Sequence, residues 1–171
     1  MSTLPDRVLE SDRLVLRRIT EDDALFLLEL LNDEAFLRFI GDRGVRTEDD
    51  ARAYARNGPI ASYQRHGFGL LLTALKDDNT PIGICGLLKR DTLEDVDVGF
   101  AFLPAFRTRG YAFEAVTAVL SYARGTLGLS RVVAIVNADN ERSRKLLMRA
   151  GLQFERLVQQ ESDGPSVELF G

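Results

Sequence analysis

In the N-terminal part of the chain, apolar residues recur with a helical spacing after each of two similar polar segments. Thr20 and Thr47 are each followed by three acids. A threonine can cap the first amides of a helix, and acids in the first turn are favoured by the helix dipole. We therefore expect a helix after each threonine, with a first strand over residues 13–18. Pro59 either begins a further helix or kinks the second one.

The pattern becomes typical of strands near residue 68. Residues 68–75, 82–88 and 95–103 are mostly apolar and are separated by short polar segments. Three consecutive strands with short links predict an antiparallel meander. Pro104 ends the third strand of this meander, because proline cannot donate to a sheet ladder.

A long amphipathic helix is predicted after Gly110. Its apolar residues have the spacing of one helix face and are Ala112, Ala115, Val116, Val119, Leu120 and Ala123. A short buried strand over residues 131–136 follows, then a helix over 141–149 and a closing hairpin over 152–161 and 166–170. This order of elements predicts one domain over residues 1–171, of the α+β class (mixed α/β).

Composition narrows the classes of function. The single Cys85 and the single His66 exclude an intramolecular disulfide and a cluster of Cys or His around a metal, so no metal is expected. The formal net charge of −4 disfavours nucleic acid as a partner and favours a basic substrate. The chain starts without a signal-peptide pattern and has no apolar stretch of membrane-spanning length. We therefore expect a cytoplasmic protein without a membrane partner.

The segment from Arg107 to Ala112 carries the clearest chemical signal. It joins a strand to a helix, contains Gly110 and lacks acids. Amides at a helix N-terminus are unpaired, so the turn predicts a site for phosphate or pyrophosphate. Arg107 and Arg109 add positive charge, although such arginines can also be merely solvated. The segment is neither a Walker A loop nor a G-x-G-x-x-G turn, which disfavours nucleotide hydrolysis and dinucleotide binding.

Three motifs resemble the GNAT family of N-acetyltransferases. The family's acetyl-CoA loop reads Gln/Arg-x-x-Gly-x-Gly/Ala, which Arg107, Gly110 and Ala112 satisfy. The run Asn140-Glu141-Arg142-Ser143, followed by Ala150-Gly151-Leu152, resembles the family's Asn-x-x-Ser helix and its Gly-Phe, with Leu152 in place of Phe. The segment Leu9–Arg17 resembles the RimJ/RimL branch, which acetylates protein N-termini among other substrates.

The resemblance implies a central mixed, mostly antiparallel sheet flanked by helices, with a splay between the fourth strand (95–103) and the fifth (131–136). Acetyl-CoA would enter this splay. Its pantetheine arm would pair with the backbone of Phe102 and Leu103, and its pyrophosphate would bind the amides of Arg107, Thr108, Arg109, Gly110, Tyr111 and Ala112. An amine from a protein N-terminus or a small molecule would attack the thioester directly. Cys85 is then not needed as a nucleophile and is expected to be a buried thiol.

Asp97 is the candidate general base of this implied reaction. An ammonium with a pKa of about 10 must lose a proton before it can attack. Asp97 lies two residues before Gly99, where many relatives have a glutamate, and its shorter side chain calls for a bridging water. Alternatively, Asp97 only belongs to a solvated acidic edge with Asp91, Glu94 and Asp95. Either way, this acidic cluster would attract a cationic amine.

Ser143 is the candidate donor to the departing thiolate, or it serves only in capping its helix. Asn140 is expected to cap that helix and to contact the cofactor. Asn137 either contacts the pantetheine amide or ends its strand.

These residues leave three hypotheses. The first is an acetyl-CoA-dependent N-acetyltransferase, active as a monomer or homodimer. The alternative is a CoA-binding sensor without catalysis, which the short side chain of Asp97 motivates. The third is a general binder of phosphate ligands.

Overall fold

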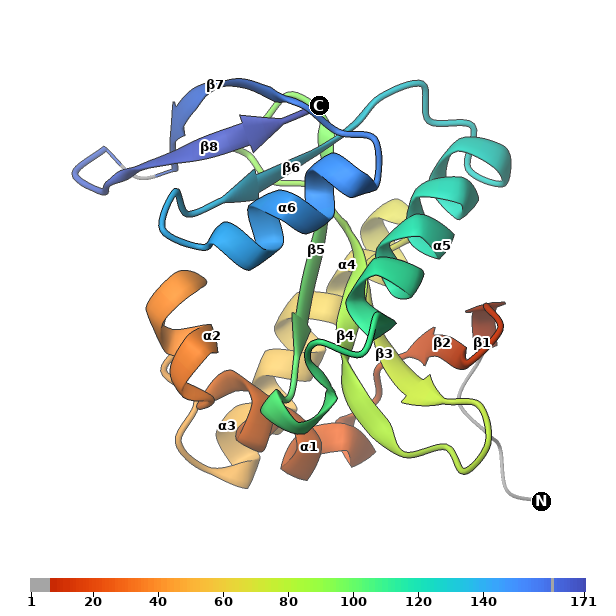
Figure 1. Cartoon of the computed structure of the whole chain (residues 1–171). Helices are drawn as coiled ribbons and strands as arrows, with labels where there is room; N and C mark the ends of the chain where they lie inside the picture. The colour runs from red at the N-terminus through yellow and green to blue at the C-terminus, as the bar shows by residue number, and fades with distance from the viewer. Residues whose placement is uncertain (1–6, 161) are drawn as a thin grey trace.

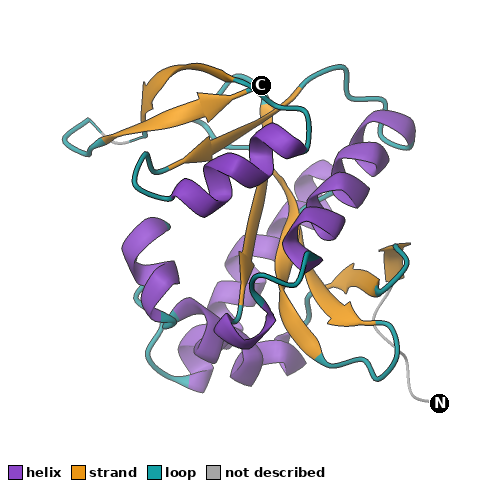
Figure 2. Ribbon diagram, viewed as in Figure 1, coloured by secondary structure: helices purple, strands orange, loops and turns teal. Residues whose placement is uncertain are grey.

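The computed structural model describes residues 7–160 and 162–171. Its strands form an eight-stranded sheet in the order β1-β2-β3-β4-β5-β6-β8-β7 (Figure 1). Neighbouring strands are antiparallel, except that β5 and β6 run parallel. The predicted α+β class, with a mixed and mostly antiparallel sheet flanked by helices, is confirmed (Figure 2).

The strands are β1 (Arg7–Glu10), β2 (Leu14–Arg18), β3 (Leu70–Leu75), β4 (Pro81–Leu88), β5 (Val96–Phe102), β6 (Val132–Val136), β7 (Phe154–Gln159) and β8 (Ser166–Phe170). The α-helices are α1 (Ala24–Leu31), α2 (Glu34–Phe39), α3 (Glu48–Ala55), α4 (Ala61–His66), α5 (Tyr111–Gly125) and α6 (Glu141–Arg149). Short 3₁₀ turns cover Glu21–Asp23 and Pro104–Phe106, and a π-helical turn covers Arg56–Ile60.

Most elements lie where the sequence predicts them. Thr20 and Thr47 each form a capping box with the acid three residues later. Pro59 lies inside the π-helical turn that joins α3 to α4. The sequence did not predict β1 or α2. Glu161, where the predicted closing strand ended, lies outside the described residues, as do residues 1–6 of the predicted domain.

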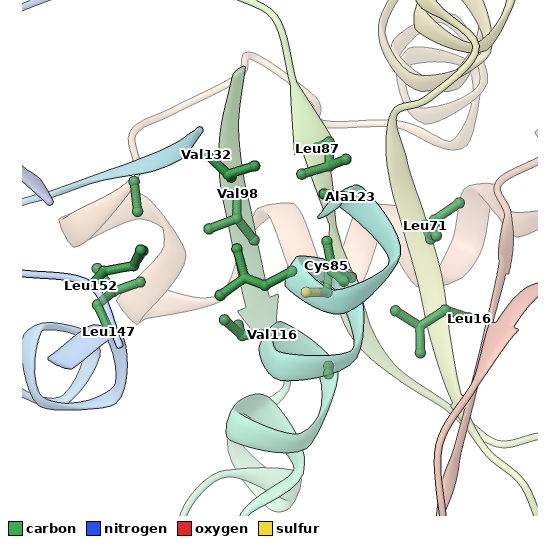
Figure 3. Close-up of a cluster of buried hydrophobic side chains, with 14 of the residues drawn as sticks. Leu16, Leu71, Cys85, Leu87, Val98, Val116, Ala123, Val132, Leu147 and Leu152 are labelled. Carbon is green, nitrogen blue, oxygen red and sulfur yellow. The ribbon is translucent and has the colours of Figure 1, made fainter. Parts of the chain in front are cut away.

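Helices cover both faces of the sheet. The apolar face of α5, including Val116 and Val119, packs on one face together with Leu147 of α6. On the other face, α1 and α3 pack through residues such as Leu27 and Ala51. Cys85 is fully buried in the cluster under α5 (Figure 3), and burial raises the pKa of its thiol. The prediction of a buried thiol is confirmed.

The two parts of the sheet separate between β5 and β6. Their pairing is confined to Val96 with Val132 and Asp97 with Val133. Beyond Asp97, β5 stays paired with β4 on its other edge, whereas β6 from Ala134 onward pairs with β8. The diverging directions of β5 and β6 are visible in Figure 1. This is the predicted splay, because β5 and β6 correspond to the fourth and fifth strands of the sequence prediction.

Candidate active site

The loop between β5 and α5 presents a row of unpaired amides. Thr108 and Gly110 have positive φ angles, of 64° and 83°, which turn the chain sharply into α5. The N–H groups of residues 108–113 have no hydrogen-bond acceptor among residues 7–160 and 162–171. They lie at the start of a helix of 15 residues, whose dipole favours an anion. The geometry of this loop therefore suits a phosphate group.

Arg107 is engaged within the protein. Its Nε donates to the carbonyl of Phe102 at 3.0 Å, and its guanidinium pairs with Asp33, which caps α2. Its own amide donates to the carbonyl of Pro104 at 3.2 Å, so the free donors begin at Thr108. Arg107 therefore ties the loop to α2 and to the end of β5, and its charge is offset by Asp33.

The backbone at the end of β5 offers fewer free groups than the sequence implied. The amide of Leu103 donates to Ile82 at 2.9 Å, and its carbonyl accepts from Phe106 at 3.0 Å. The sequence predicted that the backbone of Leu103 pairs with a ligand, whereas in the structure both of its backbone groups are hydrogen-bonded within the protein. Since backbone groups alternate in direction along a strand, those of Phe102 and Phe100 point away from β4 into the splay. The carbonyl of Phe102 is taken by Arg107, which leaves its N–H as the donor.

Two cavities adjoin along this splay. The loop-side cavity, of about 430 Å³, is lined by Phe102, Arg107 and Ala112 together with the first turn of α6. The Asp97-side cavity, of about 590 Å³, extends toward Tyr54 and Arg90. The residues that line both cavities are Phe36, Phe39, Ile40, Phe100, Ala101, Asn140 and Ser143. A ligand in the loop-side cavity and another in the Asp97-side cavity would therefore meet near Ser143.

Asp97 lies on β5 at the last position that pairs with β6. Its side chain is 1% exposed, and the Nε of Arg90 lies 3.1 and 3.2 Å from its two carboxylate oxygens. Burial raises the pKa of Asp97 above its ordinary value, against the opposing charge of Arg90. The carboxylate is therefore a better proton acceptor than an exposed one, and it lines the Asp97-side cavity.

The first turn of α6 faces the same space. The side chain of Asn140 accepts from the amide of Ser143 at 3.3 Å, so the predicted helix cap is confirmed. Ser143 lies in the first turn and lines both cavities. Asn137 also lines the Asp97-side cavity, while its side chain accepts from the amide of Asp139 at 2.8 Å.

The predicted residues fall into two groups in space. One group, Asp97, Asn137, Asn140 and Ser143, lines the Asp97-side cavity. The other runs from Phe102 along the loop to Ala112. Of its loop residues, Arg107 and Ala112 line the loop-side cavity, whereas Thr108, Arg109, Gly110 and Tyr111 form the adjacent turn.

The sequence prediction missed other groups in the Asp97-side cavity. These are Arg43, Tyr54 and Arg90, with Phe36, Phe39 and Ile40 from α2 and the residue after it. The strand register offered a signal for Arg90 alone: Leu88 pairs with Asp97, so Arg90 follows two residues beyond that pair. Tyr54 and Arg43 come from segments far away along the chain, and no local pattern pointed to them.

Within residues 7–160 and 162–171, no group of three or more His, Cys, Asp or Glu side chains is arranged to hold a metal ion. In the same residues, none of the helices has both the length and the apolarity that crossing a membrane requires.

Comparison with known proteins points to one family. Residues 13–153 match the family described as acetyltransferase (GNAT) domain. The chain is 29% identical over 155 residues to the N-acetyltransferase YoaA of Bacillus subtilis, covering 90% of this chain and 86% of YoaA. It is 27% identical over 165 residues to the ribosomal protein uS5 alanine N-acetyltransferase of Escherichia coli, covering 90% and 82% of the two chains.

The fold is shared with a solved structure of RimL, a ribosomal L7/L12 α-N-protein acetyltransferase in complex with coenzyme A. The two structures superpose with a TM-score of 0.81 over 96% of each chain, at 18% identity.

Proposed function

Because the chain belongs to the GNAT acetyltransferase family, we propose that it transfers the acetyl group of acetyl-CoA to a primary amine. The observation that carries this proposal is the row of unpaired amides over residues 108–113, at the end of a splayed strand. A long ligand with an anionic end and an extended arm fits this combination better than a compact one.

The residues of the splay suit acetyl-CoA. The pyrophosphate would accept from the amides of residues 108–112, at the positive end of the α5 dipole. The arm would lie in the loop-side cavity and take the N–H of Phe102, the donor that Arg107 leaves free. The thioester would then lie near Ser143, where the two cavities meet.

The proposed reaction is a direct attack. The amine nitrogen forms a bond to the thioester carbon, the carbon–sulfur bond breaks, and the sulfur leaves as a thiolate. The amine gives up one proton, for which Asp97 is the acceptor through a bridging water. Ser143 donates a hydrogen bond to the thiolate. A backbone N–H near Phe102 on β5, that of Phe100, which also points into the splay, is the donor for the developing oxyanion, a contribution of about 3 kcal/mol in other enzymes.

The acceptor is a protein N-terminus or a small-molecule amine. One relative at 27% identity acts on an alanine of ribosomal protein uS5, which supports an N-terminal acceptor. The Asp97-side cavity is lined by α2 and by the β7–β8 turn at Gly164 and Pro165. These two segments would therefore select the acceptor.

Two measurements test the proposal. Calorimetry with CoA and acetyl-CoA should detect one site, and neither ligand should be matched in affinity by ATP or a sugar phosphate. Release of free thiol from acetyl-CoA should then depend on an added amine. Absence of CoA binding at millimolar ligand would refute the proposal. CoA binding without thiol release, across protein N-terminal peptides and small amines, would favour the sensor alternative.

A further inference from the structure

The Asp97-side cavity carries charges of both signs. Four charged side chains line it, namely Arg43, Arg90, Asp91 and Asp97. The acidic edge that the sequence suggested is only partly present there, because Asp95 points elsewhere and pairs with Arg131 at 3.0 Å. Asp97 is paired with Arg90. The cavity is therefore balanced in charge, which is unlike an acidic pocket for a polycation.

Arg90 uses only part of its guanidinium on Asp97. Its Nε makes both contacts with the carboxylate, and its two terminal amino groups have no acceptor among residues 7–160 and 162–171. The side chain is 31% exposed. A planar guanidinium with two free amino groups has the geometry that a carboxylate binds with two parallel hydrogen bonds.

Arg43 and Tyr54 lie beside Arg90. Arg43 is exposed, lines the same cavity and forms no ion pair within the described part of the chain. Tyr54 is half-buried and lines the cavity together with both arginines. Tyr54 thus adds a phenol hydroxyl to the residues that line the cavity with the two cations.

We infer that Arg43, Tyr54 and Arg90 form a subsite for a carboxylate carried by the acceptor, so that the acceptor is an amine with a carboxylate close to it. This inference rests on the proposed N-acetyltransferase function. Arg90 connects this subsite to Asp97, because its Nε contacts the carboxylate of Asp97 while its two terminal amino groups stay free for the ligand. One small molecule can therefore span from Asp97, where its amine loses a proton, to the cationic subsite.

The charge balance of the cavity supports the same acceptor. An amine that carries one carboxylate has no net charge before it reacts, which matches a cavity lined by two acids and two arginines. A diamine or polyamine would bring an unpaired ammonium close to Arg43 and Arg90, which Coulomb repulsion disfavours. The shared chemistry is the carboxylate, whether it belongs to a free amino acid or to an acidic second residue of a peptide.

Paired acceptors that differ only in this carboxylate test the inference. The pairs are alanine and γ-aminobutyrate, each with the amide of its carboxylate, and tripeptides with Asp or Asn at the second position. We expect kcat/KM to be about 10- to 100-fold higher for the carboxylate member of the accepted pairs, which is the range of hydrogen bonds to charged groups. A preference confined to the amino acids identifies a free amino acid as the source, and one confined to the peptides identifies a peptide.

Arg43→Gln should reduce this ratio at least about fivefold, mainly through KM. Arg65→Gln is the matched control, since Arg65 is an exposed arginine on α4 outside the cavity, and the ratio should be unchanged. Arg90→Lys keeps a cation beside Asp97 but removes the two terminal amino groups of the guanidinium, so it should also reduce the ratio. Equal rates for both members of every pair, or a preference for the amides, would overturn the inference while leaving the acetyltransferase function intact.

A binding measurement keeps the test independent of turnover. N-acetylalanine and its amide, N-acetylalaninamide, can be titrated calorimetrically into the protein saturated with CoA. Tighter binding of the carboxylate form, lost in Arg43→Gln, supports the inference. The inference would be overturned if the carboxylate form does not bind and the rate assay detects no acetylation of an amino acid or an acidic peptide. Failure of CoA itself to bind would instead refute the proposed function.

Discussion

Glu114 connects the turn between β1 and β2 to α5, the helix that begins at the loop proposed to bind the pyrophosphate. Its carboxylate accepts from the hydroxyl of Ser11, from the amide of Arg13 at 2.9 Å and from the Nε of Arg13 at 2.7 Å. The same Arg13 donates to the carbonyl of Arg109 at 3.1 Å and lies over the ring of Tyr111 at 4.3 Å. Glu114→Gln is the perturbation that tests whether this cluster holds the loop in place.

The magnitude follows from the change in charge. Glutamine keeps an acceptor oxygen, so the hydrogen bonds are weakened rather than all lost. Charge-assisted hydrogen bonds contribute about 1.5–3 kcal/mol each and neutral ones about 1 kcal/mol. The side chain of Glu114 is 18% exposed but that of Arg13 is 47% exposed, so solvent screens part of the difference. We expect the free energy of unfolding to fall by about 2 kcal/mol at neutral pH.

The loss should depend on pH in a defined direction. Partial burial raises the pKa of Glu114, but the hydrogen bonds from Ser11 and Arg13 outweigh it and leave the pKa below the ordinary value of 4.5. A carboxylate with a lowered pKa in the folded state stabilises the protein above its unfolded pKa, and that contribution is lost as pH falls through the folded pKa. The difference between the wild type and Glu114→Gln should therefore be full at pH 6 and shrink below pH 4.5.

Urea denaturation at several pH values measures this difference, and calorimetry with CoA measures its effect on the loop. We expect CoA to bind about three- to tenfold more weakly to the variant, because the carbonyl of Arg109 loses part of its anchor. Glu29→Gln is the control, since Glu29 is an exposed carboxylate of α1 without a hydrogen bond to another described residue. An unchanged unfolding free energy at pH 6, or a difference that grows toward acid, would refute the reasoning.

Two further substitutions probe the site, and a third probes the packing of β4 against β5. Asp97→Asn should lower kcat at neutral pH and lose less at high pH, where the amine is already deprotonated; a pH profile of kcat/KM with the wild-type shape would exclude Asp97 as the base. Ser143→Ala should lower kcat with little change in the calorimetric affinity for acetyl-CoA, and the reverse split would make Ser143 a binding or capping residue. Gly83→Ala should lower the free energy of unfolding, measured in urea, by about 2 kcal/mol, because its Cβ would collide with the backbone oxygen of Ala101 on β5, whereas Gly125→Ala, with open space around it, should not destabilise the protein.

The elements with a clear local signal could be predicted from the sequence. The change from a helical to a strand period near residue 68 located β3, β4 and β5, and the threonine starts located the helices after Thr20 and Thr47. β1 and α2 are only four and six residues long, which is too short for a period to be recognised. Their places are fixed by tertiary contacts, such as the pairing of β1 with β2 and the bond between Asp33 and Arg107.

The candidate site divides in the same way. The loop from Arg107 to Ala112 is local, so its glycine and its place between a strand and a helix pointed to an anion site. By contrast, whether an individual side chain of the site is paired or buried depends on residues far away along the chain. Arg107 looked like a free cation, and only the fold reveals that Asp33, 74 residues away, offsets its charge. From the sequence, Asp97 is either a general base or part of a solvated edge, and only the fold reveals that it is buried against Arg90.

The splay between β5 and β6 explains how the loop after β5 and Asp97 would serve one ligand. Asp97 lies at the last paired position, and the anion-binding loop begins after β5 ends at Phe102. A strand rises about 3.4 Å per residue, so the five steps from Asp97 to Phe102 span roughly 17 Å. A compact phosphate ligand held at the loop would leave this distance unfilled. Only a ligand with an extended arm can bring a reactive group from the loop to the neighbourhood of Asp97, which argues against a general binder of phosphates and for a carrier of acyl groups.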